Sequence, residues 1–172
     1  MLLRIPSVLD KQELAIVRQM LAKARFVDGR LSAGQAARLV KHNQEVDRAA
    51  LTDLEPLNNL IMGKLVSHPL YRSGTLALRV AAPYYARYTP GMAYGDHLDD
   101  PIMGADGMLY RSDIAITIFL NEPDKYDGGE LVIRTAFGEN SVKLPAGDAV
   151  MYPSSSLHHV SQVTRGERLV AV

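Results

Sequence analysis

The chain has 172 residues, which suits one domain with a single hydrophobic core, because a domain of this length buries most of the surface that its unfolded chain exposes. It carries 19 basic and 19 acidic residues and no formal net charge, which argues against partners such as nucleic acid or an anionic membrane. Cysteine is absent, which excludes disulfides, thiolate metal sites and a cysteine nucleophile. Any metal must therefore be held by histidines and carboxylates. We find neither a signal peptide nor an apolar run of the roughly 20 residues that cross a bilayer, and we expect a cytoplasmic protein.

Helical spacing dominates the first part of the chain. Asp10 and Glu13 form a capping-box pattern, and apolar residues then recur at helical spacing, which predicts a helix over residues 11–24. Further helices are expected over residues 35–42 and 56–66, the latter ended by the His68-Pro69 dipeptide.

From residue 75 onward, short β-like runs alternate with turn residues. The expected strands cover residues 75–80, 84–88, 112–120, 130–135, 140–144, 149–152, 158–163 and 168–172. Many short strands after a helical lead predict a fold that is mainly β with α, a jelly roll buttressed by N-terminal helices. We expect one domain over residues 1–172, with helical support over about 1–70 and the jelly roll over 75–172.

A metal site is indicated by three side chains that lie far apart in the sequence. His97 and Asp99 flank one residue, and in an extended chain the two ends of such a triplet project to the same face. A second histidine, His158 or His159, would complete a two-His, one-carboxylate triad, which leaves three positions of an octahedral iron open for a keto acid and dioxygen. Taken alone, the His-x-Asp pair is a weak signal, and a solvated loop with Asp99 and Asp100 as turn residues is the better interpretation.

Three more side chains are candidates for binding the keto acid. Arg168 offers a planar, bidentate cation for a distal carboxylate, although an isolated arginine is more often an exposed surface residue. Tyr88 and Thr117 could donate hydroxyl hydrogen bonds to the same ligand. The alternatives are a core aromatic for Tyr88 and an ordinary strand residue for Thr117.

Several ordered blocks extend this pattern from about residue 83 to the end of the chain. They are Tyr88-x-x-Gly91-x-x-Tyr94-x-x-His97-x-Asp99, Arg111-Ser-Asp113, Tyr126-Asp-Gly-Gly-Glu-Leu131, Val142-Lys-Leu-Pro-Ala-Gly-Asp148, Tyr152-Pro-Ser-Ser-Ser-Leu-His158 and Val163-Thr-Arg-Gly-x-Arg168. These blocks resemble the PKHD-type hydroxylases, which are 2-oxoglutarate- and Fe(II)-dependent dioxygenases of the prolyl 4-hydroxylase superfamily.

The resemblance implies a double-stranded β-helix with iron bound by His97, Asp99 and His158. It favours His158 over His159 because the second iron histidine of the family precedes its oxoglutarate-binding basic residue by ten positions, as His158 precedes Arg168. His159 and Asp100 are then expected to face outward. The implied reaction hydroxylates an unidentified protein side chain or small molecule, with succinate and CO2 as co-products. Fe(II) is the expected cofactor, 2-oxoglutarate the co-substrate, and L-ascorbate a further cofactor compatible with the family.

Other features leave alternatives open. Residues 100–110, with Arg111, could line the substrate mouth or form an ordinary flexible connection. The chain stops at Val172 inside an expected strand where family members continue, so we expect a truncated C-terminus. Expected partners are 2-oxoglutarate, dioxygen and an unknown primary substrate, and a homo-oligomer is compatible with the sequence. The competing functions are a non-catalytic jelly-roll sensor that binds a metal or ligand, and a zinc hydrolase.

Overall fold

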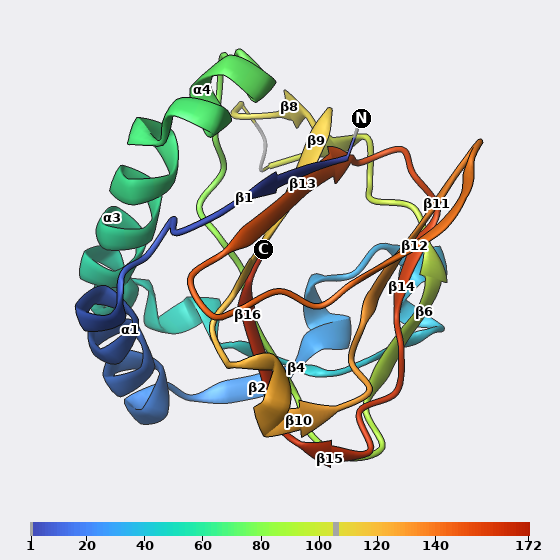
Figure 1. Cartoon of the computed structure of the whole chain (residues 1–172), viewed down its shortest axis with the longest axis horizontal. Coiled ribbons are helices and arrows are strands. Elements are labelled where there is room, and N and C mark those ends of the chain that lie inside the picture. Colours follow the sequence, from blue (N-terminus) through green and yellow to red (C-terminus); the bar gives the residue numbers. More distant parts are fainter. Residues whose placement is uncertain (1, 105–106) are drawn as a thin grey trace.

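The computed structural model describes residues 2–104 and 107–172 as two antiparallel β-sheets that face each other, with helices on the outer side of the larger sheet (Figure 1). The helices are α1 (Lys11–Lys23), α2 (Gln35–Arg38), α3 (Leu51–Ser67) and α4 (Pro69–Thr75). Three 3-10 turns are η1 (Gly29–Ser32), η2 (Arg48–Ala50) and η3 (Pro123–Lys125).

The strands form two main sheets and two short ribbons. The major sheet has the order β1 (Leu3–Ile5), β13 (Ala149–Pro153), β9 (Ile114–Phe119), β16 (Arg168–Ala171), β5 (Tyr85–Tyr88), β4 (Gln44–Val46) and β2 (Phe26–Asp28). The minor sheet has the order β12 (Gly138–Val142), β11 (Leu131–Thr135), β14 (His158–Val160), β6 (Ala93–His97) and β3 (Lys41–His42). The ribbons pair β7 (Ile102–Met103) with β8 (Tyr110–Arg111), and β10 (Tyr126–Asp127) with β15 (Arg165–Gly166). This is the expected jelly roll with helical support.

The alternation of side chains along the strands divides the interior into two cores. In β9, Ile118 packs toward the helices with Leu14, Val17 and other residues of α1 and α3. Its neighbour Phe119 packs between the two sheets with residues such as Val170 of β16. Because successive residues of a strand point to opposite faces, the central strands β13, β9, β16 and β5 supply both the helix-facing core and the inner surface of the jelly roll. Functional side chains can therefore occupy the inner surface while the helices stabilise the outer one.

Several expected elements are confirmed and others are wrong. Helix α1 matches its prediction within one residue, and α3 begins before Pro56, at Leu51. The expected helix over residues 35–42 is wrong beyond Arg38, because Lys41 and His42 pair with β6 instead. The expected strand over residues 75–80 is also wrong: helix α4 ends at Thr75, and residues 76–84, which lead to β5, join none of the sheets.

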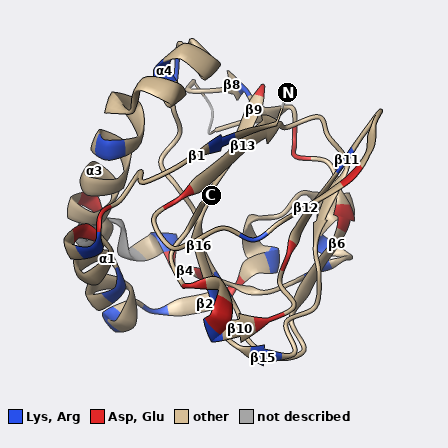
Figure 2. Ribbon diagram, in the orientation of Figure 1, with Lys and Arg blue, Asp and Glu red and all other residues tan. Residues whose placement is uncertain are grey.

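The charged residues do not gather into a face of one sign. Lysines and arginines are interspersed with aspartates and glutamates around the described part of the chain (Figure 2). Within the described residues, the helices are too short or too polar to cross a membrane.

We predict that Asp10→Ala destabilises the protein without changing its site. The Asp10 carboxylate accepts hydrogen bonds from the backbone N–H groups of Gln12 and Glu13, and Glu13 accepts one from the Asp10 N–H. Loss of such an N-cap costs about 1 kcal/mol of unfolding free energy. Urea denaturation followed by circular dichroism measures the change. Glu55→Ala, at an exposed position of α3, is the control and should change the value by less than about 0.5 kcal/mol; an equal effect in both variants would contradict the role of the cap.

Candidate active site

Two adjacent strands of the minor sheet bring His97 and His158 together. His158 of β14 lies directly opposite His97, the last residue of β6. Between this pair and the next pair, Val160 with Tyr94, β14 advances by two residues and β6 by three, so β6 carries a bulge. The extra residue lets Tyr94 and His97 face the same side, and their rings stack with centroids 3.6 Å apart.

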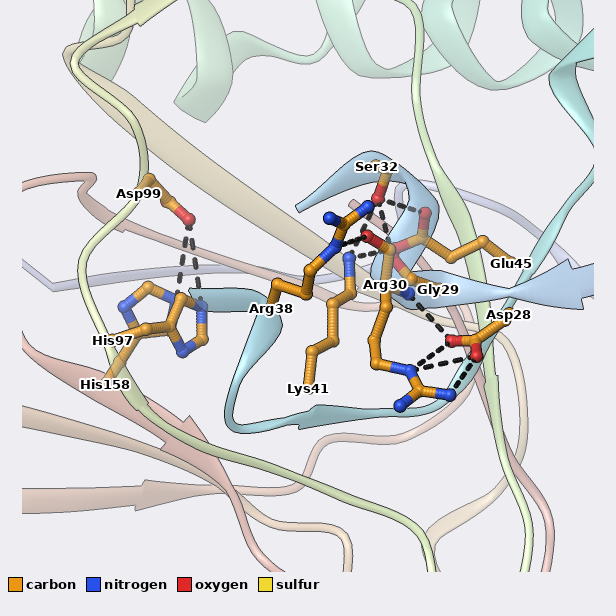
Figure 3. A network of polar contacts seen from close by, with 10 residues as sticks. All are labelled: Asp28, Gly29, Arg30, Ser32, Arg38, Lys41, Glu45, His97, Asp99 and His158. Atoms are coloured by element: carbon orange, nitrogen blue, oxygen red, sulfur yellow. Dashed lines mark hydrogen bonds and ion pairs between the residues drawn. The ribbon is translucent and has the colours of Figure 1, made fainter. Parts of the chain in front are cut away.

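Asp99 completes the cluster from the loop that follows β6. One of its carboxylate oxygens, Oδ1, lies 3.9 Å from Nε2 of His97 and 3.8 Å from Nε2 of His158 (Figure 3). The Asp99 N–H donates to the carbonyl of Ser154, which ties this loop to the segment that leads into β14. One ligand atom from each of the three residues lies within 4.8 Å of the others, a separation that suits a single bound ion.

Hydrogen bonds fix which ring nitrogen each histidine presents to the cluster. Nδ1 of His97 lies 2.8 Å from the Gly95 carbonyl, and Nδ1 of His158 lies 2.9 Å from the Ser156 carbonyl. A carbonyl oxygen can only accept, so both Nδ1 atoms carry the proton. Each Nε2 therefore turns a lone pair toward Asp99, as metal-binding histidines do when their other nitrogen is held by a carbonyl.

Burial leaves these three groups in need of a cation. It lowers the pKa of His97 to about 4, helped by the neighbouring His158, so the ring is neutral near pH 7. Burial also raises the pKa of the Asp99 carboxyl above its ordinary value, because its charge is poorly solvated. Two imidazole Nε2 atoms and a desolvated carboxylate are a donor set that suits a divalent transition metal, and the residues present fit Fe(II).

The two neighbours of the ligands differ: His159 faces away from the cluster, whereas Asp100, expected to face outward, is among the residues that line the cavity. His159 lies on the outer side of the minor sheet, where its Nδ1 is 2.9 Å from a carboxylate oxygen of Asp96. Asp96 also pairs with Arg134 of β11 at 3.1 Å. Asp100 is exposed. The choice of His158 over His159 therefore agrees with the geometry.

Arg168 projects from β16 of the major sheet toward the same interior. Only 2 % of its surface is exposed, its Nε has no hydrogen-bond partner, and it forms no ion pair within residues 2–104 and 107–172. The guanidinium carbon lies 4.9 Å from the centroid of the Tyr88 ring and 5.7 Å from that of Phe119. A buried, unpaired guanidinium is costly unless an anion binds it, and a dicarboxylate such as 2-oxoglutarate fits this need.

Tyr88 and Thr117 lie on the inner face of the major sheet beside Arg168. Tyr88 is the direct cross-strand partner of Arg168, and Thr117 shares the inner face of β9 with Ala115 and Phe119. Burial raises the pKa of the Tyr88 hydroxyl, so it stays protonated and can donate. The sequence reasoning missed Tyr152, whose ring lies edge-on to that of His158 with the ring centroids 5.1 Å apart. The alternation of side chains along β13 could have placed Tyr152 on the inner face of the sheet.

A cavity of about 770 Å³ connects the three metal-binding side chains with Arg168. It is lined by His97, Asp99, His158 and Arg168, and also by residues 76–84 and 109–113. Arg111 and part of the segment that precedes it therefore line the cavity, while Ala105 and Asp106 lie outside the described residues. Sequence reasoning also missed Lys41, Asn43 and Glu45, which line the same cavity.

Comparison with known proteins agrees with this geometry. Residues 83–172 match the family described as the 2OG-Fe(II) oxygenase superfamily. A PKHD-type hydroxylase of Thioalkalivibrio sulfidiphilus is 55% identical over 168 residues, which cover 98% of this chain and 75% of that protein. The chain belongs to the PKHD-type hydroxylases of the 2OG-Fe(II) oxygenase superfamily. A second PKHD-type hydroxylase, from Picosynechococcus sp., is 47% identical over 172 residues, or 100% of this chain and 76% of that protein.

Solved structures support the fold. A prolyl-4-hydroxylase of Pseudomonas putida aligns with a TM-score of 0.67 at 21% identity, covering 99% of this chain and 89% of that one. HygX of Streptomyces hygroscopicus, solved with nickel, 2-oxoglutarate and hygromycin B, aligns with a TM-score of 0.65 at 16% identity, covering 99% and 80%. This PKHD-type chain is a 2-oxoglutarate-dependent dioxygenase that uses Fe(II) and hydroxylates an unidentified substrate. Its family does not favour the sensor or zinc-hydrolase alternatives.

We predict that the two neighbouring histidines respond oppositely to replacement. His158→Ala removes an inward-facing donor and should weaken metal binding on the order of 100-fold. His159→Ala removes only the outward contact with Asp96 and should leave the affinity within about threefold. Anaerobic titration with Co(II), followed by its visible absorption, measures both. Metal binding that survives in His158→Ala but fails in His159→Ala would overturn the assignment of faces.

Proposed function

We propose that His97, Asp99 and His158 hold Fe(II) and act as the catalytic centre, and that Arg168, Tyr88 and Thr117 bind 2-oxoglutarate. The observation that carries the co-substrate assignment is the burial of the Arg168 guanidinium with no ion-pair partner among the residues that the structure describes. The cavity also connects Arg168 with the three metal-binding side chains. A dicarboxylate can therefore reach the guanidinium with one end and the metal with the other.

Separate side chains would bind the co-substrate and position the metal-binding rings. Arg168 would form a charge-assisted hydrogen bond with the distal carboxylate, while the protonated hydroxyl of Tyr88 and that of Thr117 would donate to carboxylate oxygens. Tyr94 and Tyr152 pack against the rings of His97 and His158, which holds the nitrogens in place and excludes water from one side. Bound iron would supply the redox chemistry that joins the decarboxylation of the keto acid to hydroxylation of the substrate.

Several expectations remain proposals. We retain one catalytic domain over residues 1–172 and a cytoplasmic location for the protein. Dioxygen and 2-oxoglutarate are the co-substrates of the family, whereas use of L-ascorbate and assembly into a homo-oligomer stay predictions. Neither nucleic acid nor a membrane is expected as a partner, since charges of both signs are interspersed over the chain (Figure 2).

We predict slow release of succinate from 2-oxoglutarate by the iron-loaded protein when air is admitted. His97→Ala should abolish this turnover together with metal binding. Arg168→Met should retain the metal but weaken 2-oxoglutarate binding by roughly 10- to 100-fold, because a charge-assisted hydrogen bond is lost. Chromatographic measurement of succinate, with calorimetric titration of 2-oxoglutarate into Mn(II)-loaded protein, separates the two effects. Turnover retained by His97→Ala would contradict the iron site, and unchanged 2-oxoglutarate affinity in Arg168→Met would contradict the co-substrate site.

Gly129 gives a second test of Arg168. Its backbone has φ +69°, and a Cβ atom there would lie 3.0 Å from Cδ of Arg168 and 3.1 Å from Cε2 of Tyr126. We predict that Gly129→Ala shifts the guanidinium and weakens 2-oxoglutarate binding severalfold while Mn(II) affinity is kept. Gly138→Ala is the matched control, because Gly138 also has a positive φ of +110° but a Cβ there meets nothing within 4 Å. Calorimetric titration of both variants makes the comparison; an equal loss in both would assign the effect to backbone strain alone.

A further inference from the structure

A second polar cluster lies on the wall of the same cavity, apart from the proposed iron and co-substrate residues (Figure 3). Nζ of Lys41, from β3, lies 2.6 Å from Oε1 of Glu45, from β4. Ser32 of η1 donates its hydroxyl hydrogen to Oε2 of Glu45 at 2.6 Å and accepts from Nζ of Lys41 at 2.9 Å. Only 7% of the Lys41 side chain and 10% of that of Glu45 are exposed. We call these three residues the Lys41 cluster.

The Lys41 cluster lies next to the metal-binding side chains. Lys41 is the cross-strand partner of Tyr94, and its Nζ lies 5.2 Å from the centroid of the Tyr94 ring. The other neighbour of that ring is His97, whose centroid is 3.6 Å away. A ligand that touches Lys41 would therefore lie close to the side chains proposed to hold the metal.

Burial of the Lys41–Glu45 ion pair is energetically unfavourable unless the pair has a further role. Taking two charges out of water costs several kcal/mol per ion, and apolar residues of similar volume are often at least as stabilising. The pair nevertheless lies at the cavity wall, and neither residue belongs to the proposed metal or co-substrate site. An ammonium group has three N–H donors, and Glu45 and Ser32 accept two of them. Among the described residues, no acceptor is found for the third.

The charges of the lining residues indicate whether the group that accepts the third N–H of Lys41 is charged or neutral. Lys41 is matched by Glu45, and Arg111 by Asp113 at 2.8 Å. In the loaded site, the charges of Fe(II) and Arg168 would together be balanced by Asp99 and the dianionic co-substrate. The remaining charged lining residues are one arginine and one aspartate, Arg79 and Asp100. The loaded cavity thus has no surplus charge with which to attract an ionic substrate.

Most of the uncharged residues that line the cavity have apolar side chains. The segment from α4 to β5 contributes Leu76, Leu78 and Val80, and Met103 and Leu109 line the cavity from the region of the β7–β8 ribbon. A cavity of about 770 Å³ is also larger than a small keto acid needs, and pockets of this size accept drug-sized organic molecules. The open part of the cavity therefore suits an apolar body with few polar groups.

We propose that Lys41, held in place by Glu45 and Ser32, donates a hydrogen bond to a carbonyl oxygen of an uncharged, largely apolar primary substrate. This inference rests on the proposed function, since it takes the cavity to be the oxygenase site. It defines a substrate class, a neutral amide-like carbonyl compound, and it makes Lys41 a residue that orients the carbon to be oxidised.

The test uses two probes with the same alkyl chain, N-methylhexanamide and hexanoate, and protein loaded with Mn(II) and 2-oxoglutarate. Saturation-transfer NMR measures their affinities, and the relaxation that Mn(II) causes in the probe protons measures their distance from the metal. We expect the amide to bind more tightly than hexanoate and to be relaxed by Mn(II). Equal or tighter binding of hexanoate, or no binding of the amide, would overturn the proposal.

Matched variants assign the effect to the cluster. Lys41→Met should weaken amide binding about tenfold, the loss of one hydrogen bond to a charged donor. Because Lys41→Met leaves Glu45 buried without its partner, the double variant Lys41→Met/Glu45→Gln removes both charges and keeps a hydrogen-bonding partner for Ser32. The control is Lys143→Met/Glu130→Gln, which alters a second Lys–Glu–Ser cluster, with Ser161, that does not line the cavity.

Amide affinity that is unchanged in the Lys41 variants, or lowered equally in the control, would refute the role of Lys41. The amide affinity is also measured in the absence of Mn(II). Binding of Mn(II) and binding of 2-oxoglutarate are measured separately for the wild-type protein and for each variant. Failure of the metal or the co-substrate to bind counts against the proposed function. A failure confined to the amide counts against the Lys41 subsite alone.

Discussion

The site depends first on the pairing of β14 with β6. This register sets His158 opposite His97 in the minor sheet, and the bulge in β6 turns Tyr94 to the same side as His97. A slip of β14 by one residue would send His158 to the outer face, where His159 and Asp96 now lie. The hydrogen bonds from each Nδ1 to the carbonyl two residues earlier then orient the rings, so strand register and ring orientation together define one metal position.

The two sheets contribute different chemistry to one cavity. The minor sheet carries the two histidine nitrogen donors, of which burial keeps that of His97 neutral, whereas the major sheet carries the cationic Arg168 with Tyr88 across from it. The helices α1 and α3 pack on the other face of the major sheet, so the strands that hold Arg168 are buried on both sides. A rigid scaffold of this kind suits a reaction in which two small molecules and a metal must meet in one geometry.

The N-terminal third does more than support the sheet. Its strands β3 and β4 extend the minor and major sheets, and they bring Lys41 and Glu45 to the cavity wall from opposite sides of a short turn. Helical periodicity predicted α1 well, because thirteen residues with a cap and a regular apolar face carry a strong local signal. It failed for residues 41–42, because a two-residue strand has no period and exists only through its partner in β6.

The sequence by itself determined the strand-rich class, the His97-x-Asp99 pair and, through resemblance, the choice of His158 and Arg168, because these depend on local pattern and on spacing along the chain. Only the tertiary structure decided that Arg168 is buried with no ion-pair partner among the described residues, that Tyr152 packs on His158, and that the Lys41 cluster lines the same cavity as the metal-binding side chains. The physical reason is that burial, desolvation and ion pairing arise between segments far apart in the chain. They exist once strand register has brought those segments together, and no local pattern of residues encodes them.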